Sequence, residues 1–187
     1  MKLKKISAVT GLLSILGMII HIIYQCFAYI TMYYNPFLKM LTAIPVVIMV
    51  CIHAVLGMII VFTRPDGTDL TSYPSLNKKT ILQRVSAALI FPLLILHLNH
   101  FSLMQASIQA GQIACFILLV LAEILFFAVC ITHVSISFTK AFITLGILSS
   151  EKTYDILDKI IYIIGGVVFA VSIVAVLRGQ LLMFGLI

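Results

Sequence analysis

The sequence predicts an all-α integral membrane protein with five transmembrane helices, and three observations support this class. Of the 187 residues, 63% are hydrophobic and only 10% are charged, whereas about a quarter of the residues of a soluble protein are charged. The apolar residues form five runs, each long enough to cross a bilayer. The basic residues lie in short clusters between these runs. The net charge of +6 is therefore expected to set the orientation in the membrane, and no nucleic-acid partner is expected.

The first two apolar runs predict two consecutive spans. The first covers about residues 6–33 and carries His21. It follows three lysines but is too long for a signal peptide and lacks a small-residue cleavage site, so we expect it to remain uncleaved. Asn35 opens a turn, and the second span follows at about 38–63 with His53.

The third span follows the first properly polar segment of the chain. Residues 64–80 contain two prolines, a glycine and both signs of charge, which is typical of a loop. The apolar run at about 81–104 comes next. Arg84 lies near its beginning, and His97 and His100 lie near its far end.

The last two spans surround a second polar segment. The fourth span, at about 113–138, holds Glu123 and His133, and the fifth covers about 160–184. Between them, residues 140–159 predict a surface turn or an interfacial helix. No repeat or second domain is evident, so residues 1–187 are expected to form a single transmembrane domain.

The distribution of basic residues predicts the orientation of these spans. On one side lie Lys2, Lys4, Lys5, Arg64, Lys78, Lys79, Arg84, Lys140, Lys152 and Lys159, and on the other lie Lys39 and Arg178. Cytoplasmic loops of membrane proteins carry the excess of lysine and arginine. We therefore expect a cytoplasmic N-terminus and a C-terminus on the outside.

The intramembrane histidines fall at two depths. At a helical rise of about 1.5 Å per residue, His21 and His97 lie roughly 20 and 24 Å from the cytoplasmic boundary. By the same rise, His53 and His133 lie roughly 14 and 8 Å from it, and Glu123 lies roughly 22 Å from it. Two histidines therefore share the outer half of the membrane, and two share the inner half.

With two histidines at each of two depths, a bundle of the first four helices could hold two haems, each ligated by two histidines. A zinc or copper ion would need its ligands at one level. Small residues one turn from a histidine would let a flat macrocycle approach. They are Gly17, Gly57 and Ser137. The alternative is that each histidine makes a hydrogen bond across the bundle or lines a polar cavity.

Three sequence blocks carry a resemblance to a known family. They are HAVLGMIIVFT from His53 to Thr63, LQRVSAALIFPLLILH from Leu82 to His97, and HVSISFTKAFITLG from His133 to Gly146. In order and spacing the chain resembles the di-haem cytochrome b558-type membrane anchor of succinate dehydrogenases and menaquinol-linked fumarate reductases. His21 falls where the first-helix ligand is expected. The sequence departs from the family pattern at Ala87, Ile136 and Ser137.

The resemblance implies two haems b in the bacterial cytoplasmic membrane. His21 and His97 would ligate the outer haem iron, and His53 and His133 the inner one. A flavoprotein and an iron–sulfur subunit would dock on the cytoplasmic face and perform the dicarboxylate chemistry. This chain would carry electrons between the iron–sulfur subunit and a membrane quinone, which is expected to be menaquinone. The family register alone selects His97 over His100 as the ligand.

Four further residues are candidates for the site. Arg84 would contact a haem propionate or the docking subunit, or act only as a positive-inside anchor. Arg178 would serve an outer-haem propionate or extend to the lipid headgroups. Glu123, the only carboxylate inside a span, would donate or relay a proton at an outer quinone site, or be a hydrogen-bonded structural acid. His100 would contact the quinone or a water molecule.

Two other functions remain open from the sequence. One is a cofactor-free transport or channel component in which the histidines line a proton or ion path. The other is the cytochrome b of a different quinone-linked oxidoreductase, such as a hydrogenase or a formate dehydrogenase.

Overall fold

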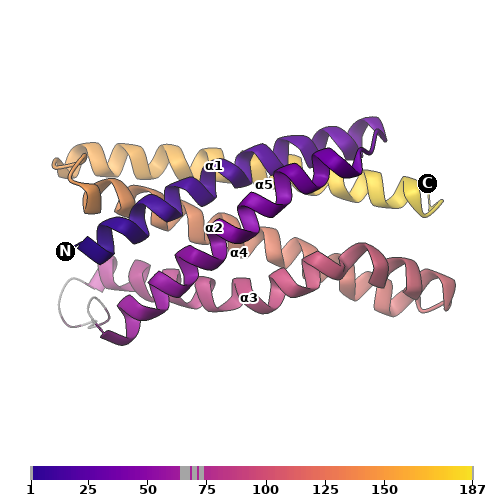
Figure 1. Ribbon diagram of the computed structural model, residues 1–187, viewed down its shortest axis with the longest axis horizontal. Helices are drawn as coiled ribbons and strands as arrows, with labels where there is room; N and C mark the ends of the chain where they lie inside the picture. Colours follow the sequence, from indigo (N-terminus) through magenta and orange to yellow (C-terminus); the bar gives the residue numbers. More distant parts are fainter. Residues whose placement is uncertain (1, 64–67, 69–70, 72–73, 187) are drawn as a thin grey trace.

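The computed structural model describes residues 2–63, 68, 71 and 74–186, and these residues form a bundle of long helices (Figure 1). The helices are α1 (Lys2–Thr31), α2 (Pro36–Thr63), α3 (Pro74–Gln109), α4 (Ile113–Leu145) and α5 (Glu151–Met183). All five are long and apolar enough to cross a membrane. The predicted all-α class is therefore confirmed, and each of the five predicted spans corresponds to a helix that is long and apolar enough to cross a membrane.

Three helices extend further into the polar segments than predicted. Helix α3 begins at Pro74 rather than at residue 81, α4 continues to Leu145 rather than 138, and α5 begins at Glu151 rather than 160. Of the predicted loop, residues 64–67, 69–70 and 72–73 lie outside the described residues. The extensions are helical because their polar side chains find partners on neighbouring helices, as with Lys79, whose ammonium lies 2.7 Å from the carboxylate of Asp158.

Local capping fixes two of the turns. The Asn35 side chain accepts hydrogen bonds from the backbone N–H groups of Phe37 (3.0 Å) and Leu38 (3.2 Å), which are left without helical partners in the first turn of α2. At the end of α4, Gly146 adopts φ +81°, and its N–H donates to the carbonyl of Ile143. This left-handed conformation favours glycine because it has no Cβ.

The helices form two antiparallel hairpins joined by α5. Helices α1 and α2 make the first hairpin and α3 and α4 the second; α5 packs on α4 and α1, and α1 also contacts α4. The start of α1, the end of α2, the start of α3 and the α4–α5 turn gather at one end of the bundle (Figure 1). The described residues of the predicted cytoplasmic cluster belong to this end. Its cytoplasmic location stays a prediction.

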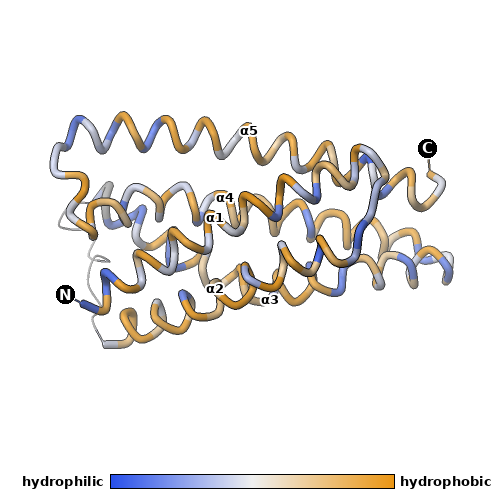
Figure 2. The backbone as a smooth tube through the Cα atoms, turned by 45° about the horizontal axis from the view of Figure 1, so that its top comes forward, coloured by the Kyte–Doolittle hydropathy of each residue, from blue (hydrophilic) through white to orange (hydrophobic). Residues whose placement is uncertain are grey.

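The bundle is apolar outside and partly polar inside. Apolar residues dominate all five helices (Figure 2), and large side chains such as Phe62 and Phe37 point outward, 82% and 70% exposed. Helix α2 contains no fully buried residue. Polar side chains are as numerous as apolar ones among the buried residues described. Because polar groups are costly in hydrocarbon, this polar interior marks where a functional site can lie.

Candidate functional site

The structure brings His53 and His133 together at the end of the bundle that holds the N-terminus. His53 lies on α2 and His133 on α4. Their ring centroids are 6.5 Å apart, and their planes are inclined at 68°. We call these two residues the inner pair. The sequence placed both in the same half of the membrane from helical rise alone.

Backbone carbonyls orient both rings of the inner pair. His53 Nδ1 lies 2.9 Å from the Ser7 carbonyl oxygen, and His133 Nδ1 lies 3.1 Å from that of Gln83. A carbonyl can only accept, so Nδ1 carries the proton in each neutral ring and Nε2 keeps its lone pair. Over the described part of the chain, no hydrogen bond is found at either Nε2. Both rings are therefore in the state in which imidazole ligates a metal.

Gly11 provides the surface on which the His53 ring rests. A Cβ atom added at Gly11 would lie 2.9 Å from Cε1 and 3.1 Å from Nδ1 of that ring. Both distances are shorter than an ordinary contact, which is about 3.5–4.0 Å between carbon atoms. Glycine at this position of α1 therefore allows the ring to approach the helix backbone.

The spacing of the inner pair is compatible with two imidazoles that would hold one metal ion between them. Imidazole nitrogens bind a metal at about 2.0–2.1 Å, so two imidazoles on opposite sides of one ion have ring centroids roughly 6–6.5 Å apart. The observed separation is 6.5 Å. The hydrogen bonds from Nδ1 to carbonyls are the outer-shell contacts that ligating histidines make.

The outer histidines are oriented by side chains instead of carbonyls. His21 Nδ1 on α1 lies 3.3 Å from the Thr42 hydroxyl on α2. His97 Nδ1 on α3 lies 2.7 Å from a carboxylate oxygen of Glu123 on α4. His21 and His97 are close enough to interact electrostatically. We call them the outer pair; no direct ring contact between them is found among the described residues.

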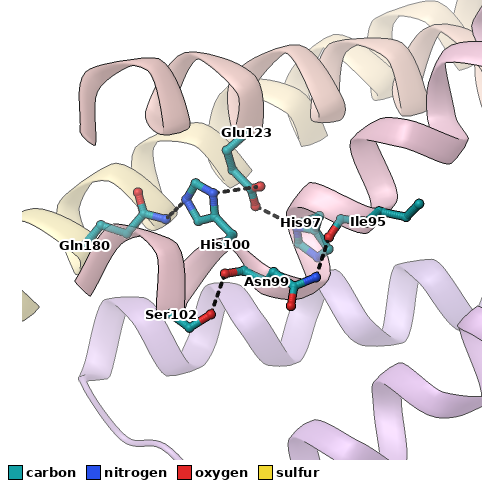
Figure 3. Close-up of polar contacts among 7 residues, drawn as sticks. All are labelled: Ile95, His97, Asn99, His100, Ser102, Glu123 and Gln180. Carbon is teal, nitrogen blue, oxygen red and sulfur yellow. Dashed lines mark hydrogen bonds and ion pairs between the residues drawn. The ribbon is translucent and has the colours of Figure 1, made fainter. Parts of the chain in front are cut away.

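Glu123 connects His97 to a second histidine (Figure 3). Its other oxygen lies 3.7 Å from His100 Nδ1, and His100 Nε2 lies 3.0 Å from the amide nitrogen of Gln180 on α5. His100 and Glu123 are 5% and 6% exposed. Both nitrogens of His100 thus face protein groups, whereas no hydrogen bond to His97 Nε2 is found in the part of the chain that the structure describes.

The two candidate arginines have different surroundings. Arg178 Nη1 donates to the Ile30 carbonyl at 2.9 Å and approaches the Tyr29 carbonyl at 3.5 Å. It therefore caps the C-terminal end of α1, a contact that neither sequence hypothesis anticipated. Arg84 is half-buried on α3 and interacts electrostatically with Lys140.

The three small residues chosen from the sequence do not share one role. A Cβ at Gly17 would meet the Val46 side chain at 3.1 Å, so Gly17 serves the contact between α1 and α2. Gly57 faces open space within 4 Å. The Ser137 hydroxyl accepts a hydrogen bond from the Gln83 amide at 2.8 Å. Gly11 was not singled out, although it lies against a histidine ring.

A polar network at the end near the N-terminus also escaped the sequence analysis. The Asp158 carboxylate accepts hydrogen bonds from Lys79 at 2.7 Å and from the fully buried Thr139 hydroxyl at 2.8 Å. Lys140 donates to Gln83 at 3.1 Å. These contacts join α3, α4 and α5. The sequence signal for this network was Asp158, an acidic residue in a segment that was expected to lie at the membrane surface.

The described residues were compared with known metal-binding arrangements and with known proteins. Within these residues, no group of three or more histidine, cysteine or acidic side chains is arranged to hold one metal ion. Comparison of the chain with protein-family models, curated proteins and solved structures found no match. The function of this five-helix membrane protein is therefore argued from its own residues.

Proposed function

We propose that this chain is the membrane-anchor cytochrome b subunit of a succinate dehydrogenase or fumarate reductase. It would carry electrons between an iron–sulfur subunit and a membrane quinone, with two haems b bound between its first four helices. Three sequence blocks suggest this family: one begins at His53, one ends at His97 and one begins at His133.

The single observation that carries the proposal is the geometry of the inner pair. His53 and His133 come from different hairpins, yet their rings lie 6.5 Å apart. A carbonyl holds the Nδ1–H of each ring, which leaves both Nε2 lone pairs for iron. A histidine that only made a hydrogen bond across the bundle would share the carbonyl contact, but it would not need a second imidazole from the other hairpin at this separation.

The chain's residues would hold the cofactors and tune them. When bound, haem supplies one-electron chemistry between ferric and ferrous iron, at a potential set by its axial ligands and their hydrogen bonds. Ser7 and Gln83 fix the orientation of the inner ligands through their carbonyls, and Glu123 fixes that of His97. The apolar exterior keeps these groups in a low-dielectric environment inside the membrane.

The end that holds the N-terminus is the proposed docking face for the soluble flavoprotein and iron–sulfur subunits. Basic residues from α1, α3 and α5 lie there, among them Lys2, Lys78 and Lys152. Such a cluster favours a partner with an acidic surface. Dicarboxylate chemistry would then occur in the partner, outside this chain.

A spectrum of the purified chain tests the cofactor assignment. We expect a reduced-minus-oxidised difference spectrum of low-spin haem b and two haems per chain. Absence of haem from protein that is folded and helical would refute the proposal. Co-purification of a flavin-containing and an iron–sulfur subunit would support the complex, whereas co-purification of a hydrogenase or formate dehydrogenase would assign a different oxidoreductase.

One observation favours a second candidate, a proton-conducting membrane protein without haem. His97, Glu123, His100 and Gln180 form a continuous chain of polar contacts inside the helical bundle. Chains of acidic residues and histidines occur as proton relays in membrane transporters. Proton flux through reconstituted, haem-free vesicles, lost on replacement of Glu123 by glutamine, would identify this function.

A further inference from the structure

The two histidine pairs differ in the chemistry of their supports. Both inner rings donate to neutral backbone carbonyls. In the outer pair, Thr42 supports His21 with a hydroxyl, whereas Glu123 supports His97 with a carboxylate at 2.7 Å. A hydrogen bond to a carboxylate is about twice as strong as one between neutral groups. His97 is therefore the one histidine of the four that is bonded to an acidic side chain.

We propose that Glu123 is a positioning residue for His97. It holds the Nδ1–H of the ring, which leaves Nε2 as the nitrogen that can ligate, and increases the electron donation of the imidazole to iron. The proposal rests on the proposed function, because it requires a haem at the outer pair. It also selects between the two histidines on α3: His97 ligates, and His100 supports the carboxylate.

The surroundings of Glu123 fit this role. The carboxylate is 6% exposed, and its second oxygen faces His100 at 3.7 Å. His100 in turn meets the Gln180 amide at 3.0 Å. The ring of His97 stacks on Phe126 with centroids 4.7 Å apart. Contacts from α3, α4 and α5 therefore hold both the carboxylate and the imidazole in place.

The negative charge of Glu123 would affect the redox potential of the outer site. A carboxylate inside a membrane needs a compensating positive charge. Ferric iron carries one more positive charge than ferrous iron. With two neutral imidazoles as ligands, a ferric centre would therefore compensate the negative charge of this carboxylate better than a ferrous one. Glu123 therefore favours the oxidised state of the outer site, and its neutralisation favours reduction.

Potentiometry of the Glu123→Gln variant tests the proposal in the intact complex. Glutamine keeps an oxygen that can accept from His97 Nδ1 but removes the charge. We expect both haems to be retained, the midpoint potential of the outer haem to become more positive, and the low-spin electron paramagnetic resonance signal of that haem to shift. Ser86→Ala is the matched control, because Ser86 lies 3.1 Å from Nδ1 of the inner ligand His133. It should leave the outer haem unchanged.

The outcomes separate this inference from the proposed function. A wild-type protein without haem would overturn the proposed function. Two haems in the wild type, with an unchanged midpoint and signal in Glu123→Gln, would overturn only the role of Glu123. If Glu123→Gln does not fold, the Glu123→Asp and Glu123→Asn pair decides, because the two differ in charge at nearly equal size. A more positive outer midpoint in the asparagine variant supports the inference, and equal midpoints overturn it.

Discussion

Replacement of Gly11 by alanine is the most direct test of the inner pair. The new Cβ would lie 2.9 Å from Cε1 of His53. Ordinary carbon contacts lie at about 3.5–4.0 Å, so the ring must withdraw by roughly 0.6–1.1 Å. Because α1 is held by its own backbone hydrogen bonds, the ring moves more readily than the helix.

This withdrawal has a calculable cost. It lengthens the 2.9 Å hydrogen bond from His53 to the Ser7 carbonyl, and a typical hydrogen bond contributes about 0.5–1.5 kcal/mol. Overpacking at a tight contact costs about 1–3 kcal/mol. A combined loss of about 1.5–4.5 kcal/mol, if borne by the haem-bound state, corresponds to roughly 12- to 1,600-fold weaker retention of the inner haem.

The assay is haem content per purified chain, combined with a redox titration. We expect the Gly11→Ala protein to keep the outer haem and to lose the inner one, or to hold it with an altered midpoint. Gly166→Ala is the matched control, since nothing lies within 4 Å of a Cβ at that position. A Gly11→Ala protein with two haems and wild-type midpoints would refute the idea that the ring of a ligating His53 rests on Gly11.

Two further predictions concern the histidines and the polar network. His97→Leu should remove one haem and His53→Leu the other, whereas His100→Leu should keep both; loss of a haem in His100→Leu alone would reverse the ligand assignment. Lys79→Met should destabilise the bundle by about 2 kcal/mol, because it leaves the buried Asp158 carboxylate without its cation; the value is below that of a fully buried pair since Lys79 is 34% exposed. Thermal unfolding in detergent measures this destabilisation, and an unchanged unfolding temperature would contradict the prediction.

Helical rise explains why much of the site could be predicted from sequence. Membrane thickness and rise per residue are nearly constant, so counting along a span gives the depth of a side chain. His53 and His133 lie together as this count required. The same count put Glu123 at roughly 22 Å and His97 at roughly 24 Å, so their contact was also within reach of the sequence.

The rotation of each helix about its axis could not be predicted in the same way. Every residue has a carbonyl, and only rotation decides that those of Ser7 and Gln83 face histidine rings. Rotation likewise decides that Gly11 supports a ring while Gly57 faces open space. At the start of α5, a helix was one of two alternatives predicted from the sequence; what the sequence could not predict is the burial of the Asp158 carboxylate, because its partners are distant in sequence.

The hairpin architecture also constrains how such a protein would be made. Each histidine is oriented by the other helix of its own hairpin: His53 by α1, His21 by α2, His133 by α3 and His97 by α4. Yet each hairpin supplies only one histidine to each pair. During synthesis, the first hairpin would enter the membrane with its imidazoles already aimed but unable to complete either site. In such a protein the two histidines of the outer pair would both be present once α3 has been inserted, and those of the inner pair once α4 has been inserted, so haem loading would follow the order of translation.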